Sequence, residues 1–551
     1  MAVARPRSIF SRVDKVLMVG LSGIPLLKAC GLGGHRWLMV AMVLTVTAAG
    51  MSGHAARDIK LRYDTLRYAL VADQVVAGNG IRLSVLPHWQ QHDPSGLTPF
   101  TIQPPGYPLA LAALGSVRLD RIWPGQVINI IGHVVIVWCV WLITWRLAGF
   151  WIGAATGLFA AICYPLLFVA SMMLSEVMYI ALSMGCLLGV VMAQSSDRRG
   201  AWLVVAALAA AGAVATRLSG IALLPVLAWQ VLVALRRGGW RAIFSSVAVL
   251  VAALVMLALL LARNWVYSGE LRGFPVAAQD RSLQGAITGT LPVLSKLLSL
   301  NIASIKSLVL IILVILTIVV LLGRKRSGGE AQVWRSGLNM VVLAAVSYYG
   351  FLLSAFMRYV PYFEPRYFVP LTPMLVIVLF VALAKGWGPL AVAGWSGAGK
   401  VVLIGSILYC LAFGGYDTLA RWPERARIPD KREIISRTMR VMAPLQDRLL
   451  PGERIASNRE MEIAFATGRP TMRLPVVRPN FDWEWPEDYP RWLSDRMAGS
   501  GTRYLVLVAP VKGLDEHRWG RWLAALSQRE DAEPPFTRTW QLPDGVIYEL
   551  K

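Results

Sequence analysis

Residues 242–262 read AIFSSVAVLVAALVMLALLLA, an apolar run without a charged side chain. A helix needs roughly 20 such residues to cross the hydrocarbon core of a bilayer. Comparable runs recur from residue 36 onward, and the sequence predicts about eleven spans in all. These are 36–53, 123–145, 149–169, 174–193, 200–216, 219–235, 242–262, 300–322, 336–356, 367–384 and 400–415. The chain is therefore expected to be a polytopic α-helical membrane protein.

Composition explains a charge balance that would otherwise suggest a nucleic-acid partner. The 551 residues carry a net charge of +23, but they are 56% hydrophobic and only 16% charged. Soluble domains average about 25% charged residues. Residues 1–415 hold 33 Lys or Arg and 12 Asp or Glu, whereas residues 416–551 hold 22 and 20. The excess belongs to the apolar part, so no nucleic-acid partner is expected.

The distribution of basic residues predicts orientation. They gather in the N-terminal segment and in alternate short loops, at Arg146, Arg198, Arg199, Arg236, Arg237, Arg241, Arg324, Lys325, Arg326, Arg335, Lys385 and Lys400. Cytosolic loops carry such an excess of Lys and Arg. The pattern therefore predicts a cytosolic N-terminus; the expected setting is a bacterial inner membrane. The short apolar stretch 16–27 is expected to lie on the cytosolic surface as an interfacial helix.

Two domains are predicted. Residues 1–415 would form the transmembrane domain, including a long outer loop at 54–122, and residues 416–551 a soluble periplasmic α/β domain. In the latter, the apolar runs 504–508 and 546–548 predict strands, and the polar stretches 431–449 and 514–529 are compatible with helices. An odd number of spans places this domain on the outer face.

The outer loop contains the first candidate catalytic residues. Residues 57–77, RDIKLRYDTLRYALVADQVVA, predict a helix near the membrane surface. Asp64 and Tyr68 are four residues apart and share a face of it, and Asp58 lies near the end of the first span. A carboxylate just outside the bilayer is a functional candidate, although a capping or solvated role is the alternative.

The sequence does not predict a metal site. His88 and His92 have helical ligand spacing, but nearby prolines disfavour a helix there. Acidic residues at 482–488 lie among tryptophans in the tail and are expected to be solvated. The five cysteines contain no CxxC and mostly lie in or beside apolar runs, so they indicate neither a metal nor a disulfide framework. No obligatory metal or cofactor is expected.

A resemblance to a known family follows from the outer loop. DTLRYALVADQVVAGNGI, followed by QPPGYPLALAAL, resembles the first outer loop of the GT-C glycosyltransferases. The most similar branch contains the protein O-mannosyltransferases and the lipid A aminoarabinose transferases. Asp64 and Tyr68 match the acid and tyrosine of that branch, and Pro104 and Pro105 match its proline pair. Gln103 stands where the aminoarabinose transferases have a lysine, which puts that particular substrate in doubt.

Later segments resemble the same family in the same order. They are Ser175-Glu176 with Tyr179, Thr216-Arg217 with Gly220, Arg263-Asn264 with Gly269, Glu364-Pro365-Arg366-Tyr367, and Gly468-Arg469-Pro470-Thr471. The resemblance implies a GT-C fold and transfer of one sugar, hexosyl or pentosyl, from a polyprenyl-phosphate donor. The acceptor would be a hydroxyl of a glycan, glycolipid or protein on the outer face, and an inverting displacement is expected.

Roles for the candidate residues follow from this implied chemistry. Asp64 is the expected general base, because a carboxylate against the membrane can have a raised pKa. Glu176 is a second acid and Asp58 the fallback. Arg217, Arg263 and Arg366 fall at outer ends of spans, and their planar guanidinium groups suit the donor phosphate. Glu364, Tyr367 and Tyr68 are expected to help bind substrate, although Glu364 could instead be a structural partner of an arginine.

Two alternatives remain open at this point. A lipid-linked sugar transporter or flippase would need polar residues deep within several spans, whereas the acids gather at one face and the span interiors are nearly uncharged apart from Lys306. A glycan polymerase or ligase would also act on the outer face but would use a lipid-diphosphate donor. The sugar and the acceptor stay open.

Overall fold

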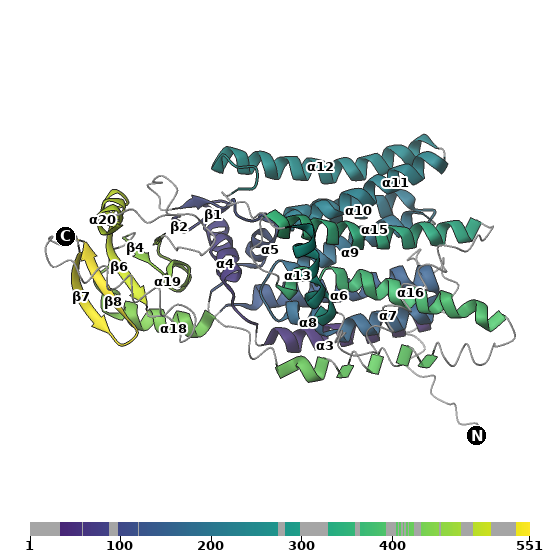
Figure 1. Ribbon diagram of the computed structural model, residues 1–551, viewed down its shortest axis with the longest axis horizontal. Helices are drawn as coiled ribbons and strands as arrows, with labels where there is room; N and C mark the ends of the chain where they lie inside the picture. The colour runs from purple at the N-terminus through teal and green to yellow at the C-terminus, as the bar shows by residue number, and fades with distance from the viewer. Residues whose placement is uncertain are drawn as a thin grey trace, which may run out of the picture.

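The structure is a computed structural model that describes most of the chain (Figure 1). The described residues are 34–57, 59–86, 97–118, 121–194, 196–237, 239–273, 282–297, 329–358, 364–392, parts of 404–423, 431–450, 453–474, 489–508 and 536–550. Long helices form a bundle at one end, and a small sheet with short helices lies at the other. Helices α4 (Tyr63–Val76) and α5 (Gly106–Leu114) lie between the two parts.

Within the described ranges, seven helices are long and apolar enough to cross a membrane. They comprise α3 (Gly34–Arg57), α6 (Trp123–Ala148), α9 (Glu176–Ala193), α10 (Arg199–Thr216), η1 (Leu218–Leu223) continued by α11 (Leu224–Arg237), α12 (Trp240–Ser268) and α15 (Gly329–Arg358). A further pair, α7 (Phe150–Ile162) and α8 (Tyr164–Ala170), is bent by 48° and would make an eighth.

The predicted total of eleven spans stays a prediction. Helix α16 (Leu371–Val392) follows the short helix η2 (Pro365–Phe368) and lies close to the predicted run 367–384. Helix α13 (Leu283–Leu297) comes earlier and is the last described element before residue 329. The predicted run 300–322 lies outside the described residues, as does most of 400–415. The interfacial helix expected at 16–27 is also outside them.

Helix α9 lies at the centre of the bundle, whereas α12 lies at its edge. Of the apolar window of α9, 78% is buried, against 22% for α12. Glycine permits the close contact between α9 and α10: a Cβ on Gly189 would lie 2.7 Å from the carbonyl oxygen of Trp202. In a bilayer, burying apolar side chains between helices gains little over leaving them in lipid, so helices associate through close packing. Small residues allow that close approach. The second half of α9 therefore packs closely against the first half of α10.

The small sheet has six strands in the order β2-β5-β4-β6-β8-β7. These are β2 (Val85–Leu86), β4 (Arg454–Ser457), β5 (Thr471–Arg473), β6 (Thr502–Val508), β7 (Phe536–Leu542) and β8 (Gly545–Leu550). The first four in this order are parallel, and β8 and β7 add antiparallel pairs. Helices α18 (Lys431–Met442), α19 (Glu460–Thr467) and α20 (Tyr489–Gly499) accompany them.

Strands are confirmed at both predicted runs, 504–508 and 546–548, and a helix within 431–449. The stretch 514–529 lies outside the described residues. Edge strand β2 comes from the outer loop and pairs with β5, so the sheet is not built from residues 416–551 alone. The division into two domains at residue 415 stays a prediction.

Helix α4 is confirmed where the outer loop predicted it, but it is more enclosed than a helix lying on a membrane surface. Residues 65–72 are all buried. The bundle covers one side of α4 and α19 contacts the other. Helix α5 is anchored by the glycine of its PPGYP turn, because a Cβ on Gly106 would lie 2.6 Å from the carbonyl oxygen of Ala215 at the end of α10.

Candidate active site

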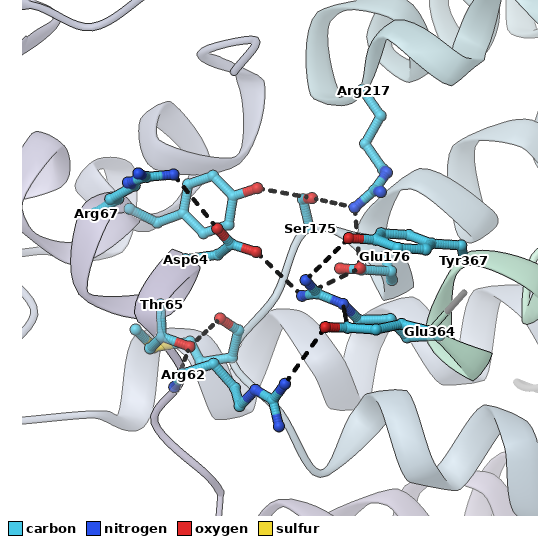
Figure 2. A network of polar contacts seen from close by, with 12 residues as sticks. Arg62, Asp64, Thr65, Arg67, Ser175, Glu176, Arg217, Glu364 and Tyr367 are labelled. Atoms are coloured by element: carbon cyan, nitrogen blue, oxygen red, sulfur yellow. Dashed lines mark hydrogen bonds and ion pairs between the residues drawn. The ribbon is translucent and has the colours of Figure 1, made fainter. Parts of the chain in front are cut away.

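Charged side chains from four parts of the chain meet where the bundle faces α4 (Figure 2). Asp64 lies in the first turn of α4, and Glu176 is the first residue of α9. Arg217 occupies the turn between α10 and η1, and Arg366 belongs to η2, immediately before α16. Each group therefore lies at or beside the end of a helix, and Glu176, Arg217 and Arg366 reach the first turn of α4 from the bundle.

Arg366 joins the carboxylates of this site. Its Nη1 lies 3.1 Å from Asp64 Oδ2 and 3.8 Å from Glu176 Oε1, and its Nε contacts Glu364 Oε2. Its Nη2 also donates to the hydroxyl of Tyr367 at 3.4 Å. A single guanidinium thereby holds three acids from separate segments in one cluster. Burial of Arg366, which is 8% exposed, strengthens these interactions relative to a surface ion pair.

Arg217 forms the second half of the cluster. Its Nη1 lies 3.0 Å from Glu176 Oε1 and donates to Ser175 Oγ, also at 3.0 Å. The Ser175 hydroxyl is 3.1 Å from that of Tyr68, so α4 and the start of α9 are connected through it. Glu176 is only 1% exposed, and its Oε2 has no hydrogen-bond partner within the part of the chain that the structure describes.

The loop before α9 is fixed by amide and hydroxyl groups. Asn129 of α6 donates from Nδ2 to the carbonyl oxygens of Ala170 and Met172, at 2.9 and 2.8 Å. Thr65 of α4 donates to the carbonyl of Met173 at 3.0 Å. These bonds satisfy carbonyls left over where α8 ends. They set the point at which α9 starts, and hence the position of Glu176.

The described cluster has one more cation than anions. Four guanidinium groups alternate with three carboxylates: Arg62, Arg67, Arg217 and Arg366 against Asp64, Glu176 and Glu364. Arg67 Nη1 lies 3.6 Å from Asp64 Oδ1, and Arg62 Nη2 lies 3.8 Å from Glu364 Oε1. An excess of positive charge in a mostly buried site favours an anionic ligand.

The expectation of a raised pKa for Asp64 is wrong. Burial alone would raise the pKa of this carboxyl, but the charges of Arg366 and Arg67 and the hydrogen bond from Arg366 outweigh it and hold the pKa below its usual value. The pKa of the Tyr68 hydroxyl is raised, first by burial and then by the negative charge of Asp64. Asp64 is therefore ionised and Tyr68 protonated at neutral pH.

The structure brings together most of the candidate residues, namely Asp64, Tyr68, Glu176, Arg217, Glu364, Arg366 and Tyr367. Arg263 stands apart from them: it donates to the carbonyl of Phe100 and, at 3.5 Å, to Asn264. The ring of Phe100, whose carbonyl Arg263 contacts, lies 6.5 Å from the ring of Tyr68. Asp58 lies outside the described residues.

Sequence reasoning missed several members of the cluster. Arg67 is three residues after Asp64 on a predicted helix, so the spacing could have predicted that Arg67 lies close to Asp64. Arg62 lies in the turn before α4, and the contact of Asn129 with α8 depends on the bend after α7; no local pattern indicates either. Among the described residues, no group of three His, Cys, Asp or Glu is placed to hold a metal ion. His88 and His92 lie outside that part.

No protein-family model matches the chain, and no curated protein matches it in sequence. Solved structures do resemble it. Two crystal structures of ArnT from Cupriavidus metallidurans each match 94% of this chain and 98% of their own chain. The apo structure has a TM-score of 0.58 and 16% sequence identity. The structure bound to undecaprenyl phosphate has a TM-score of 0.55 and 14% sequence identity. The oligosaccharyltransferase AglB from Archaeoglobus fulgidus, in complex with an inhibitory peptide and a dolichol-phosphate, matches 85% of this chain and 69% of its own, with a TM-score of 0.50 and 12% identity. The chain therefore has the GT-C fold that its outer loop predicts.

Proposed function

We propose that this GT-C-fold protein is a glycosyltransferase that moves a single sugar from a polyprenyl-phosphate donor to an acceptor hydroxyl. The observation that carries the proposal is the cluster in which Arg366 holds Asp64 and Glu176 beside Arg217, where the bundle meets α4. The fold supports it, since ArnT has been crystallised with undecaprenyl phosphate. A lipid tail beside apolar helices would bring its phosphate to this level.

Arg217 and Arg366 are the proposed phosphate ligands. Both are partly engaged by carboxylates, and each guanidinium carries five N–H donors, so both retain donors for phosphate oxygens. Glu176, almost wholly buried and close to both, would hold the pair in place rather than react. The hydroxyl of Tyr367 and the carboxylate of Glu364 would orient Arg366 from its other side.

Asp64 is the proposed base. Its side chain is 21% exposed, whereas that of Glu176 is 2% exposed, so an acceptor reaches Asp64 more readily. In an inverting displacement, the acceptor oxygen attacks the anomeric carbon, the bond to the phosphate oxygen breaks, and its electron pair leaves with the phosphate. The acceptor proton passes to Asp64. When the donor phosphate binds Arg366, it competes with Asp64 for this guanidinium. The pairing that lowers the pKa of Asp64 then weakens, and Asp64 becomes a stronger base.

The remaining parts of the proposal concern setting and partners. The positive-inside pattern supports a bacterial inner-membrane protein with a cytosolic N-terminus and the sheet in the periplasm. The acceptor would be a glycan, a glycolipid or a protein, and no metal or other cofactor enters the reaction.

The test uses purified protein in lipid nanodiscs with a panel of polyprenyl-phosphate sugars, and mass spectrometry to detect released polyprenyl phosphate. Asp64→Asn should reduce transfer by roughly a hundredfold or more, the scale of general-base catalysis. Asp73→Asn is a matched control on the same helix, because its amide oxygen can still accept the 3.0 Å bond from Val117 N–H. Wild-type turnover by Asp64→Asn would refute the assignment of the base.

The same purified protein, reconstituted into proteoliposomes as well, separates the competing functions. Movement of intact lipid-linked sugar across proteoliposomes, without transfer, would make the protein a transporter. Turnover only with lipid-diphosphate sugars would make it a polymerase or ligase. Either result would overturn the proposed reaction.

A further inference from the structure

The helix that carries Asp64 is attached to the sheet as well as to the bundle. Before α4, the carbonyl of Leu61 accepts from Lys431 N–H at 3.1 Å, and that of Ile59 accepts from Arg432 at 3.0 Å. After α4, strand β2 pairs with β5, where Val85 is opposite Thr471. Both flanks of α4 are therefore fixed by residues near the C-terminal end of the chain.

A buried polar cluster links α19 to the first turn of α4. The Tyr63 hydroxyl donates to Glu460 Oε1 at 2.9 Å, and Arg473 Nε lies 3.5 Å from the same oxygen. Glu460 is 4% exposed, so these contacts are largely shielded from solvent. Burial and the charge of Glu460 raise the pKa of Tyr63 to about 12, so its hydroxyl keeps the proton that it donates. The orientation of the Tyr63 ring is thereby set by α19 and β5.

Arg67 connects this cluster to the candidate active site. Its guanidinium carbon lies 4.4 Å from the centre of the Tyr63 ring, a cation–π geometry. The same guanidinium lies 3.6 Å from Asp64. The described contacts thus form a continuous series from Glu460 through Tyr63 and Arg67 to Asp64.

We propose that Tyr63 and Glu460 are positioning residues that hold Arg67 beside Asp64, so that the sheet sets how strongly the candidate base is paired. The assignment of Asp64 as a base rests on the proposed function, whereas the contacts from Glu460 through Tyr63 and Arg67 to Asp64 do not depend on it. Arg67 stacks on a ring that cannot rotate freely while its hydroxyl is bound to Glu460. Loss of the ring, or of its anchor, would let Arg67 leave Asp64 for solvent.

The sign of the effect follows from the groups that face Asp64. Arg366 and Arg217 from the bundle and Arg67 from α4 all favour its ionised form, and burial opposes them. Tyr68 also lies close to it. Tyr63 in turn faces Arg473, Glu460 and Lys431. Weakening Arg67 therefore raises the pKa of Asp64, while Arg366 and Arg217 keep part of the depression.

The test measures the titration of Asp64 without requiring sugar transfer. A hydrophobic carbodiimide modifies protonated carboxyl groups, and mass spectrometry of the α4 peptide reports the pH at which half of Asp64 reacts. Arg67→Gln sets the full effect, an upward shift of roughly one pH unit. Tyr63→Leu should give a substantial part of that shift, and Glu460→Gln a smaller part, because its amide oxygen can still accept from the Tyr63 hydroxyl. Tyr63→Phe, which keeps the ring and loses only the hydroxyl, should give a smaller shift in the same direction.

Glu462→Gln is the matched control, since Glu462 is two residues further along α19, is similarly buried and pairs with Lys431 at 2.7 Å. It should leave the midpoint unchanged. The proposal is overturned if Tyr63→Leu, Tyr63→Phe and Glu460→Gln all titrate like the wild type, or if Arg67→Gln itself causes no shift. Should the wild type transfer no sugar, the proposed function falls while the labelling still decides this point.

Discussion

Replacing Arg366 with glutamine tests the centre of the cluster. The substitution removes a cation that contacts Asp64, Glu176 and Glu364. Each carboxylate keeps a second guanidinium: Arg67 at 3.6 Å, Arg217 at 3.0 Å and Arg62 at 3.8 Å respectively. No buried carboxylate is left without a cation, so we expect the protein to fold. Its free energy of unfolding should fall by less than the 3–5 kcal/mol or so that follows removal of one partner of a buried ion pair.

The substitution should also weaken binding of the donor. A hydrogen bond to a charged group contributes about 1.5–3 kcal/mol, which predicts donor binding weaker by roughly 10- to 150-fold. The pH dependence should change as well. Asp64 has a depressed pKa in the folded protein, so its contribution to stability is present above the unfolded pKa and is lost as pH falls through the folded one. Without Arg366 the folded pKa rises, and the acid limb of kcat/KM moves up by roughly one pH unit.

Binding of radiolabelled undecaprenyl phosphate to nanodisc-embedded protein measures the first effect, and kcat/KM across pH measures the second. Arg366→Lys keeps the charge but not the planar fork, so it should give intermediate binding. Arg440→Gln is the control, because Arg440 is 61% exposed and pairs with Asp544 at the surface. Wild-type donor affinity together with an unmoved acid limb in Arg366→Gln would refute the role given to this residue.

Three further predictions concern placement. Gly106→Val should lower the unfolding temperature markedly, since a Cβ would meet the Ala215 carbonyl oxygen at 2.6 Å, whereas Gly53→Val, with nothing closer than 3.9 Å, should not. Asn129→Leu leaves two carbonyls without its amide and should lower kcat roughly ten- to a hundredfold in a transfer assay, by shifting the start of α9. A single cysteine at the exposed position Asn79 should react with a membrane-impermeant maleimide added outside intact cells, and protection there would contradict the predicted orientation.

Much of the fold was predictable because the bilayer restricts what an apolar run can do. An uncharged run such as 242–262 has to satisfy its backbone internally, so it forms a helix, and α12 does. Helix α4 was predictable from the spacing of its apolar residues, and Asp64 and Tyr68 shared a face by the same rule. The order of the motifs also indicated that Arg217 and Arg366 would reach the same level.

The rest depended on contacts between distant segments. Nothing local in Ser84-Val85-Leu86 indicates pairing with Thr471, because two residues are too short for a strand pattern. The sign of the pKa shift of Asp64 was mispredicted for a related reason. Burial was foreseen, but the number of guanidinium groups around the carboxyl depends on where η2 and the turn after α10 are placed.

The β2–β5 pairing has a consequence for how the protein is made. Residues 85 and 86 emerge from the ribosome long before residue 471, and at about 5–20 residues per second the delay is on the order of tens of seconds. Throughout that interval the outer loop lacks its neighbouring strand, and the side of α4 that contacts α19 in the fold is uncovered. A chaperone or protease on the same side of the membrane would meet this loop in its uncovered form. Premature termination after the last predicted span, 400–415, but before β5 would therefore leave the spans in place while exposing the helix that carries Asp64.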